Sequence, residues 1–147
     1  MPTAGPRKTV IGGANTEGLP FSEAIRLGNL VFVSGNVGFD DSGKIVSGGV
    51  GPETRQTFAN IEKVLKQAGC TLDDIVKVNV VLADPADFDG YNAVYRMLFT
   101  HEPPARVTTA GKLTIDARLE VDVIAGVGAG KRAPARKKVA RRGKKRR

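Results

Sequence analysis

The stretch from Pro103 to Ala125 constrains this chain most, because it predicts two neighbouring strands that carry opposite charges. Between Leu119 and Ala125, apolar residues alternate with Glu120 and Asp122. This period of two is typical of a strand with one buried face. The β-branched run Arg106–Thr109 follows two prolines, which cannot continue a helix, so it predicts a second strand.

The segment that joins these strands predicts how they pair. Gly111–Asp116 is short and contains turn-forming residues, so an antiparallel hairpin is the simplest connection. Such a hairpin would place Arg106 near Asp122. It would also place Thr108 near Glu120. An ordinary cross-strand ion pair on a solvated sheet face is an alternative explanation of these charges.

The positive charge of the chain is concentrated at one end. The net charge is +8, with 23 Lys or Arg against 15 Asp or Glu. Residues 131–147 hold eleven of the basic residues and none of the acidic ones, which leaves residues 1–130 with a net charge of −3. The sequence therefore predicts one folded domain over residues 1–130 and a disordered basic tail over residues 131–147.

Two roles suit residues 131–147. The simpler role is solvation, or loose attraction to any polyanion. The sharper role is non-specific association with nucleic acid through phosphate neutralisation, which salt would weaken steeply. No aromatic residue lies in this range, so base stacking is not indicated.

Cysteine content and hydropathy restrict the class of protein. The single cysteine, Cys70, excludes an internal disulfide and a cysteine-based metal cluster. No apolar run approaches the length of a membrane span, and the N-terminus does not resemble a secretory signal. These features predict a soluble, cytoplasmic protein of a reducing compartment, without a membrane partner.

The remaining elements predict an α+β fold. Residues 1–20 are expected to be mostly loop, with a short strand suggested only at Thr9–Ile11, and a small hairpin is expected near Asp41–Gly43. Strands are predicted over 21–27, 30–35 and 75–82, the first two joined by a Gly-Asn turn, and helices over 51–68 and 86–100. Two helices should therefore cover one face of a mixed β-sheet. The apolar run at 30–33 indicates cover on both faces, and the second face suits a subunit interface.

Several motifs then occur in the order typical of one family. They are PFSEAI at 20–25, VSGN at 33–36, NI at 60–61, DIVK at 74–77, DF at 87–88, YNAVY at 91–95 and PAR at 104–106. Together they resemble the reactive-intermediate deaminase family (RidA/YjgF), formerly labelled endoribonuclease L-PSP. The resemblance covers residues 10 to 127.

The resemblance implies a fold, an assembly and an activity. The fold is chorismate-mutase-like, assembled as a homotrimer with ligand clefts between subunits. The activity is hydrolysis of 2-imino or enamino acids to 2-keto acids and ammonia, by a 2-iminobutanoate/2-iminopropanoate deaminase-like hydrolase acting on C=N bonds. No metal or organic cofactor is expected, because a protonated imine is already reactive. Three basic tails in one trimer would raise the avidity for a polyanion.

The resemblance also assigns roles to individual residues. Arg106 would grip the substrate carboxylate, and Glu120 would hold the hydrolytic water. Substrate contacts are assigned to five further residues: Phe21, Ser34, Gly35, Asn92 and Thr108. Phe21 stands where well-characterised members have Tyr, and Thr108 stands where they have Cys, so both departures bear on substrate size and rate.

The chemistry of a 2-imino acid suits the two catalytic candidates. An arginine fork binds both carboxylate oxygens and stays charged at any working pH. In a shielded cleft such a bond contributes about 2–3 kcal/mol. A carboxylate within hydrogen-bond reach can position water and pass a proton to the departing nitrogen. Glu120 is the candidate for this carboxylate.

Simpler roles exist for several of these residues. The Ser34 hydroxyl could bind a backbone carbonyl. Asn92 is expected to make a specific bond, because Asn is not favoured inside a helix. His101 suits a surface position or a helix C-terminus better than a general base. Tyr91 and Tyr95 suit the core better than a pocket.

Two other functions compete with the deaminase. One is a non-catalytic protein of the same fold that binds a small carboxylate and has a regulatory role, with its basic tail on nucleic acid. The other, weaker hypothesis is the ribonuclease of the older family label, since no histidine is placed as a general base. Turnover of an imine separates the first of these from the enzyme.

Overall fold

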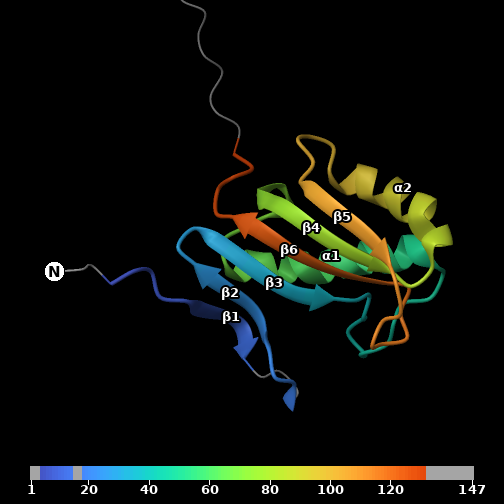
Figure 1. The fold of residues 1–147 in the computed structure, drawn as a ribbon, viewed down its shortest axis with the longest axis horizontal. Helices are drawn as coiled ribbons and strands as arrows, with labels where there is room; N and C mark the ends of the chain where they lie inside the picture. Colours follow the sequence, from blue (N-terminus) through green and yellow to red (C-terminus); the bar gives the residue numbers. More distant parts are fainter. Residues whose placement is uncertain (1–3, 15–17, 132–147) are drawn as a thin grey trace, which may run out of the picture.

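The computed structural model describes residues 4–14 and 18–131, which form one six-stranded sheet with two helices behind it (Figure 1). The predicted disorder of the basic tail concerns residues that, from 132 onward, lie outside this description. No helix in the described ranges has the length and apolar character needed to cross a membrane.

The helices and strands agree largely with the sequence pattern. The strands are β1 Thr9–Ala14, β2 Ser22–Leu27, β3 Leu30–Asn36, β4 Ile75–Leu82, β5 Ala105–Ala110 and β6 Leu119–Gly126. The helices are α1 Val50–Gln67 and α2 Phe88–Leu98, with 3₁₀ turns η2 Leu72–Asp74 and η3 Pro85–Asp87. β1 includes the short strand suggested at Thr9–Ile11 and extends it into a region predicted to be loop, and the second helix is divided into η3 and α2.

The order of the strands corrects one prediction. The sheet runs β1-β2-β3-β6-β4-β5, with β4 and β5 parallel and the other neighbouring pairs antiparallel. The predicted hairpin of β5 with β6 is therefore wrong, although the sheet is mixed as expected. β6 is a central strand, since Leu119, Val121 and Val123 are almost fully buried. β4, α2 and β5 instead form a strand-helix-strand unit, the usual way to join parallel neighbours.

The core lies between the helices and one face of the sheet. The apolar stripe predicted for α1 is confirmed: Phe58, Ile61 and Leu65 are fully buried. They pack against alternate residues of β3, β4 and β6. Glu53, in the first turn of α1, accepts a 2.8 Å hydrogen bond from the backbone N–H of Arg118, which fixes the segment entering β6.

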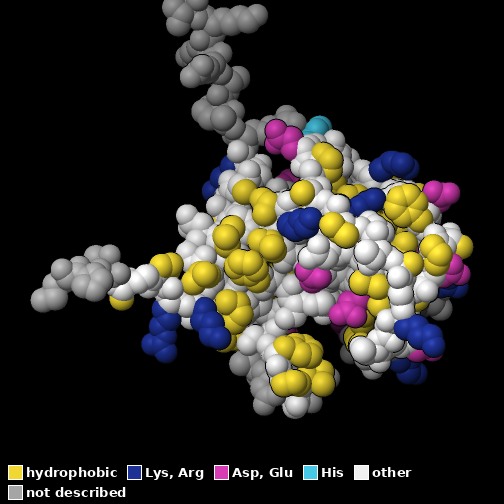
Figure 2. All heavy atoms as spheres, in the orientation of Figure 1, with side chains coloured by type: hydrophobic (Ala, Val, Ile, Leu, Met, Phe, Trp, Pro, Cys, Tyr) yellow, Lys and Arg dark blue, Asp and Glu magenta, His cyan; other side chains and the backbone are white. Residues whose placement is uncertain are grey.

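The opposite face of the sheet is uncovered in the single chain. Leu27, Leu30 and Phe32 are each about two-fifths exposed, although cover on both faces was predicted for residues 30–33. Figure 2 shows hydrophobic side chains gathered over the β2 and β3 part of this face, with charged side chains beside them. An apolar patch of this kind is typical of a surface that another protein covers.

Candidate functional site

The seven predicted site residues fall into two separate groups. Phe21, Ser34, Gly35 and Glu120 line one cavity of about 800 Å³. Arg106 and Thr108 lie instead on β5, and Asn92 lies on α2.

The cavity is bounded by the end of β3, α1 and the segment before β6. Phe21, immediately before β2, is about half exposed at the rim of the cavity, together with Leu19 and Phe39. Thr114 and Ile115 contribute from the segment before β6. The cavity therefore combines an apolar rim with the carboxylate of Glu120.

Glu120 lies against the backbone of β3. It is half-buried and in register with Val81 of β4. The pairing of β3 with β6 is irregular between Val33 and Asn36, as at a β-bulge. A Cβ atom on Gly35 would meet the Oε1 atom of Glu120, so the absence of a side chain at Gly35 makes room for the carboxylate.

Ser34 has a structural partner. Its hydroxyl donates a 2.6 Å hydrogen bond to the carbonyl of Ser22 on β2. The simpler role considered for this residue is therefore confirmed. Its side chain lines the cavity, but its proton is engaged by the backbone.

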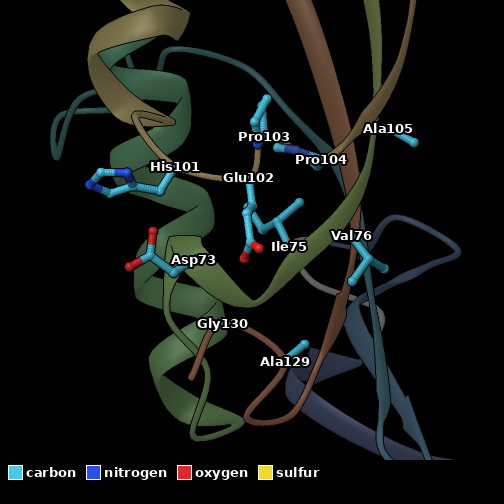
Figure 3. Close-up of a pocket in the computed structure, with 10 residues that line it drawn as sticks. All are labelled: Asp73, Ile75, Val76, His101, Glu102, Pro103, Pro104, Ala105, Ala129 and Gly130. Carbon is cyan, nitrogen blue, oxygen red and sulfur yellow. The ribbon is translucent and has the colours of Figure 1, made fainter. Parts of the chain in front are cut away.

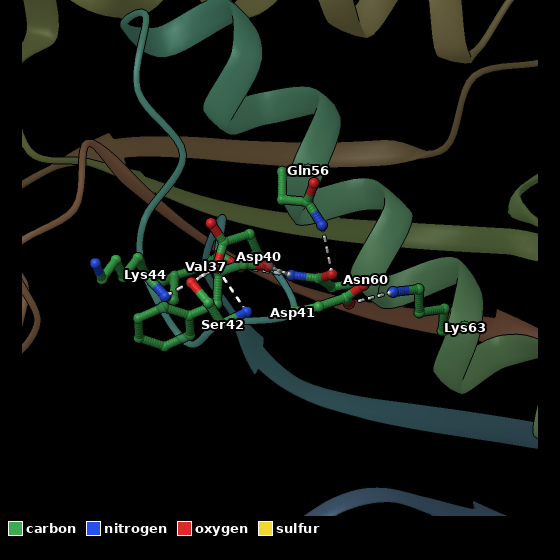
Figure 4. Close-up of polar contacts among 9 residues, drawn as sticks. Val37, Asp40, Asp41, Ser42, Lys44, Gln56, Asn60 and Lys63 are labelled. Atoms are coloured by element: carbon green, nitrogen blue, oxygen red, sulfur yellow. Dashed lines mark hydrogen bonds and ion pairs between the residues drawn. The ribbon is translucent and has the colours of Figure 1, made fainter.

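Asn60 builds the cavity wall and was not among the predicted site residues. Its Nδ2 donates to the carbonyls of Val37 at 3.1 Å and Phe39 at 2.9 Å, and its Oδ1 accepts from Gln56 Nε2 at 2.9 Å (Figure 4). Asn60 thereby fastens the segment after β3 to α1. An amide in the interior of a helix was the signal that could have identified it.

The loop beyond this segment closes on Asp40. The carboxylate accepts hydrogen bonds from the Ser42 hydroxyl at 2.6 Å and from the N–H groups of Ser42 and Lys44 (Figure 4). These bonds, led by the one from the Ser42 hydroxyl, lower the pKa of Asp40. Phe39 bridges to Ile45, so the small hairpin predicted here is confirmed.

Arg106 is held by the aromatic side chains of α2. Its guanidinium carbon lies 4.6 Å from the ring centre of Tyr95, 5.4 Å from that of Tyr91 and 5.9 Å from that of Phe88. These distances suit cation–π contacts. The tyrosines are buried, as predicted for core residues, yet they also orient Arg106. The spacing of three to four residues between Phe88, Tyr91 and Tyr95 places the three rings on one face of α2.

The surroundings of Arg106 include buried hydroxyl groups. The oxygens of Tyr95 and Thr108 are buried and have no hydrogen-bond partner among the described residues. Burial raises the pKa of Tyr95 to about 12 and also raises that of Tyr91, while the charge of Arg106 acts in the opposite direction. Neutral hydroxyls thus lie beside a fixed cation.

Asn92 is half-buried on the same helix. The specific hydrogen bond predicted for Asn92 is not found within the described part of the chain, so that prediction is wrong for the single chain.

Arg106 and Glu120 do not meet within one chain. Strand β4 lies between them. Arg106 is in register with the buried Val78, and Glu120 with Val81. Since Val78 and Val81 are an odd number of residues apart, Arg106 and Glu120 lie on opposite faces of the sheet.

The predicted contacts across the supposed hairpin are therefore wrong. Arg106 is not beside Asp122, which accepts a 2.8 Å hydrogen bond from Asn79 Nδ2, and Thr108 is not beside Glu120. The alternative explanation, a cross-strand ion pair, fails as well. Neither Arg106 nor Glu120 forms an ion pair within the described residues.

A second cavity, of about 290 Å³, lies at the other end of β6. Asp73, His101 and Glu102 surround it (Figure 3), and Gly130 lines it where the chain leaves the sheet. His101 is exposed, as predicted for a surface group. Among the described residues, no three His, Cys, Asp or Glu side chains come together as metal ligands.

Comparisons with known proteins agree with this fold. A family model described as Endoribonuclease L-PSP matches residues 15–127. The human 2-iminobutanoate/2-iminopropanoate deaminase is 36% identical over 122 residues, which cover 80% of this chain and 89% of the human protein. A RutC family protein of Pyrococcus abyssi is 40% identical over 108 residues, 72% of this chain and 85% of that protein.

A solved structure shows the same architecture. The crystal structure of a Rid family protein, YyfA from Yersinia pestis, superposes with a TM-score of 0.77 at 34% identity. The alignment covers 82% of this chain and 100% of that one.

Proposed function

Because the chain belongs to the endoribonuclease L-PSP family, whose members include its deaminase-named relatives, we propose that it hydrolyses 2-imino or enamino acids to 2-keto acids and ammonia. The observation that carries this proposal is the state of Arg106. It is a half-buried cation, oriented by aromatic rings and without a carboxylate partner among the described residues. Such a group suits a small anionic ligand, and its planar fork fits a carboxylate.

Glu120 supplies the second function that the reaction needs. Its carboxylate accepts a proton from water as the water oxygen adds to the imine carbon, and the C=N electron pair moves to nitrogen. The proton then passes to the nitrogen of the carbinolamine. The C–N bond then breaks as the Glu120 carboxylate takes the proton of the carbinolamine hydroxyl, ammonia departs, and the C=O bond of the keto acid forms. The reaction consumes one water and needs no redox partner.

The two catalytic candidates, Arg106 and Glu120, come together in an oligomer. A 2-imino acid is too small to reach both faces of a sheet, so Arg106 of one copy serves the cavity that contains Glu120 of another. This arrangement explains why each chain presents half of the chemistry on each face. The uncovered apolar residues Leu30 and Phe32 provide an interface, and the homotrimer implied by the resemblance is the assembly we propose.

The size of the substrate depends on the rim of the cavity. Phe21 presents an aromatic ring there without the hydroxyl of a Tyr. Thr108, which the copy that supplies Arg106 would bring to the same site, is branched at Cβ. We therefore propose small 2-imino acids with apolar side chains, which need no further polar partner at Phe21.

An imine generated in place by an amino-acid oxidase tests the activity. The wild-type chain should accelerate conversion to keto acid and ammonia, and Arg106→Ala should lower kcat/KM by about 30- to 150-fold, the equivalent of about 2–3 kcal/mol. Arg96→Ala is the matched control, because Arg96 is exposed on the same helix that carries the aromatic residues. It should behave as wild type.

The same assay separates the competing functions. A wild-type chain that hydrolyses the imine no faster than buffer contradicts the deaminase. If such a chain still binds a 2-keto acid and loses that binding in Arg106→Ala, it is a non-catalytic carboxylate-binding protein.

A further inference from the structure

Residues 131–147 lie outside the part of the chain that the family shares. The family model ends at residue 127, and the Yersinia pestis structure is covered completely although a fifth of this chain is not. Six Arg and five Lys occur in these 17 residues, without a single Asp or Glu. The imine chemistry proposed above has no use for them.

The structure fixes the point from which this segment starts. The N–H of Gly130 donates a 2.8 Å hydrogen bond to Oδ1 of Asp74, a buried carboxylate that also accepts the N–H of Thr71 at 2.9 Å. A Cβ atom at residue 130 would meet backbone atoms of Asp73. The chain is therefore anchored to the turn before β4 just ahead of the basic segment (Figure 3).

This anchor is remote from the cavity of Glu120. Glu120 stands at the beginning of β6, and the segment follows the end of that strand (Figure 1). At about 3.3 Å per residue, Gly126 is roughly 20 Å from Glu120. A large ligand on residues 131–147 need not cover the cavity of the same chain.

The folded domain does not neutralise the segment. Residues 1–130 carry a net charge of −3, and the cavity beside the anchor offers two carboxylates, Asp73 and Glu102. This net charge of −3 is too small to balance the +11 of residues 131–147, which leaves the chain at +8. The segment therefore has capacity for an external polyanion.

The composition of the segment favours one kind of polyanion. Its largest apolar residue is a single Val, so it has none of the aromatic or large aliphatic side chains that anchor a peptide in a membrane interface. Arg forks bind phosphate oxygens bidentately, and without aromatic residues they read no bases. We propose that residues 131–147 bind the phosphate backbone of nucleic acid, without preference for sequence.

Binding of the full-length protein to a short labelled DNA duplex tests this proposal. The matched variant is the full-length chain with Lys→Gln and Arg→Gln at all eleven basic positions of 131–147. Wild type should bind unrelated duplexes equally and lose about 10³-fold or more in affinity between 50 and 200 mM salt. The Gln variant should lose duplex binding while keeping the circular dichroism of the wild type.

Three results would overturn the proposal. One is duplex binding by the Gln variant as tight as that of the wild type. Another is wild-type binding to phosphatidylserine vesicles without binding to the duplex, which would make the partner a membrane surface. The third is wild-type binding to neither probe. None of them bears on imine hydrolysis, which is measured separately.

Discussion

At the scale of single residues, Arg106 illustrates how a fold orients a charge without an ion pair. Its strand is at the edge of the sheet, where a long cationic side chain would normally be mobile in water. The rings of Tyr91 and Tyr95 confine it instead. This confinement would reduce the entropy lost on binding the substrate carboxylate that we propose for Arg106, which is the benefit of preorganisation.

Removing the ring of Tyr95 should weaken substrate binding. A cation–π contact contributes about 0.5–2 kcal/mol, so Tyr95→Leu should raise KM by about 2- to 30-fold. Tyr95→Phe keeps the ring and should keep KM. Phe99→Leu is the control for lost packing, because Phe99 touches Tyr95 and lacks a cation–π contact with Arg106. Equal KM values for Tyr95→Leu and Phe99→Leu would contradict this role.

The buried phenol of Tyr95 should also make the fold sensitive to alkali. Its pKa is raised from 10.0 to about 12 in the folded chain. Above pH 10 the unfolded chain releases this proton and the folded chain retains it, so the free energy of unfolding should fall as the pH rises toward 12. Urea unfolding across this range should show a smaller fall in Tyr95→Phe. An identical pH dependence would contradict the assignment.

At the scale of elements, local patterns predicted most strands and helices but not every partner. β4 was predicted with its bounds, because its β-branched run ends at Asp84-Pro85. The partner of β5 was wrong, because the short link Gly111–Asp116 suggested a hairpin. The strand-helix-strand order of β4, α2 and β5 favours parallel neighbours, and the burial of β6 requires a strand on both of its edges.

The candidate site was predicted in part for the same reason. Arg106 and Glu120 could be assigned by resemblance, and their strands by alternation. The face of the sheet on which Arg106 or Glu120 lies depends on the register of β4, β5 and β6. Register is a long-range property. The contact of Arg106 with α2 likewise depends on how the helix packs. A single chain's sequence pattern does not determine either.

Asn60 should stabilise the cavity wall by holding the segment after β3 against α1. Asn60→Ala removes the donor to the carbonyls of Val37 and Phe39 and should lower the free energy of unfolding by about 1–3 kcal/mol. Gln56→Ala removes a single bond to Asn60 and should cost less. Urea unfolding compares the two variants. A decrease in the free energy of unfolding for Asn60→Ala no greater than that for Gln56→Ala would contradict the assignment.

At the scale of the whole molecule, the open apolar face and the divided site are two aspects of one arrangement. The single chain leaves Leu30 and Phe32 exposed, and it places Arg106 and Glu120 on opposite faces. The association of copies that we propose, through the open face, would resolve both features. Activity should therefore depend on assembly.

A charge on the open face should separate the copies. Phe32→Asp should give a monomer by light scattering and abolish imine hydrolysis, although no predicted site residue is changed. Met97→Asp is the control, since Met97 is exposed on α2, away from this face, and it should remain assembled and active. A Phe32→Asp monomer with wild-type activity would contradict the shared site.

The most direct measurement combines two impaired variants. Arg106→Ala and Glu120→Gln chains, each strongly impaired alone, are co-expressed in equal amounts and assayed for imine hydrolysis. If each site takes Arg106 from one copy and Glu120 from another, random assembly restores about a quarter of the wild-type activity. Mixed oligomers with no more activity than either variant alone would contradict a site shared between copies.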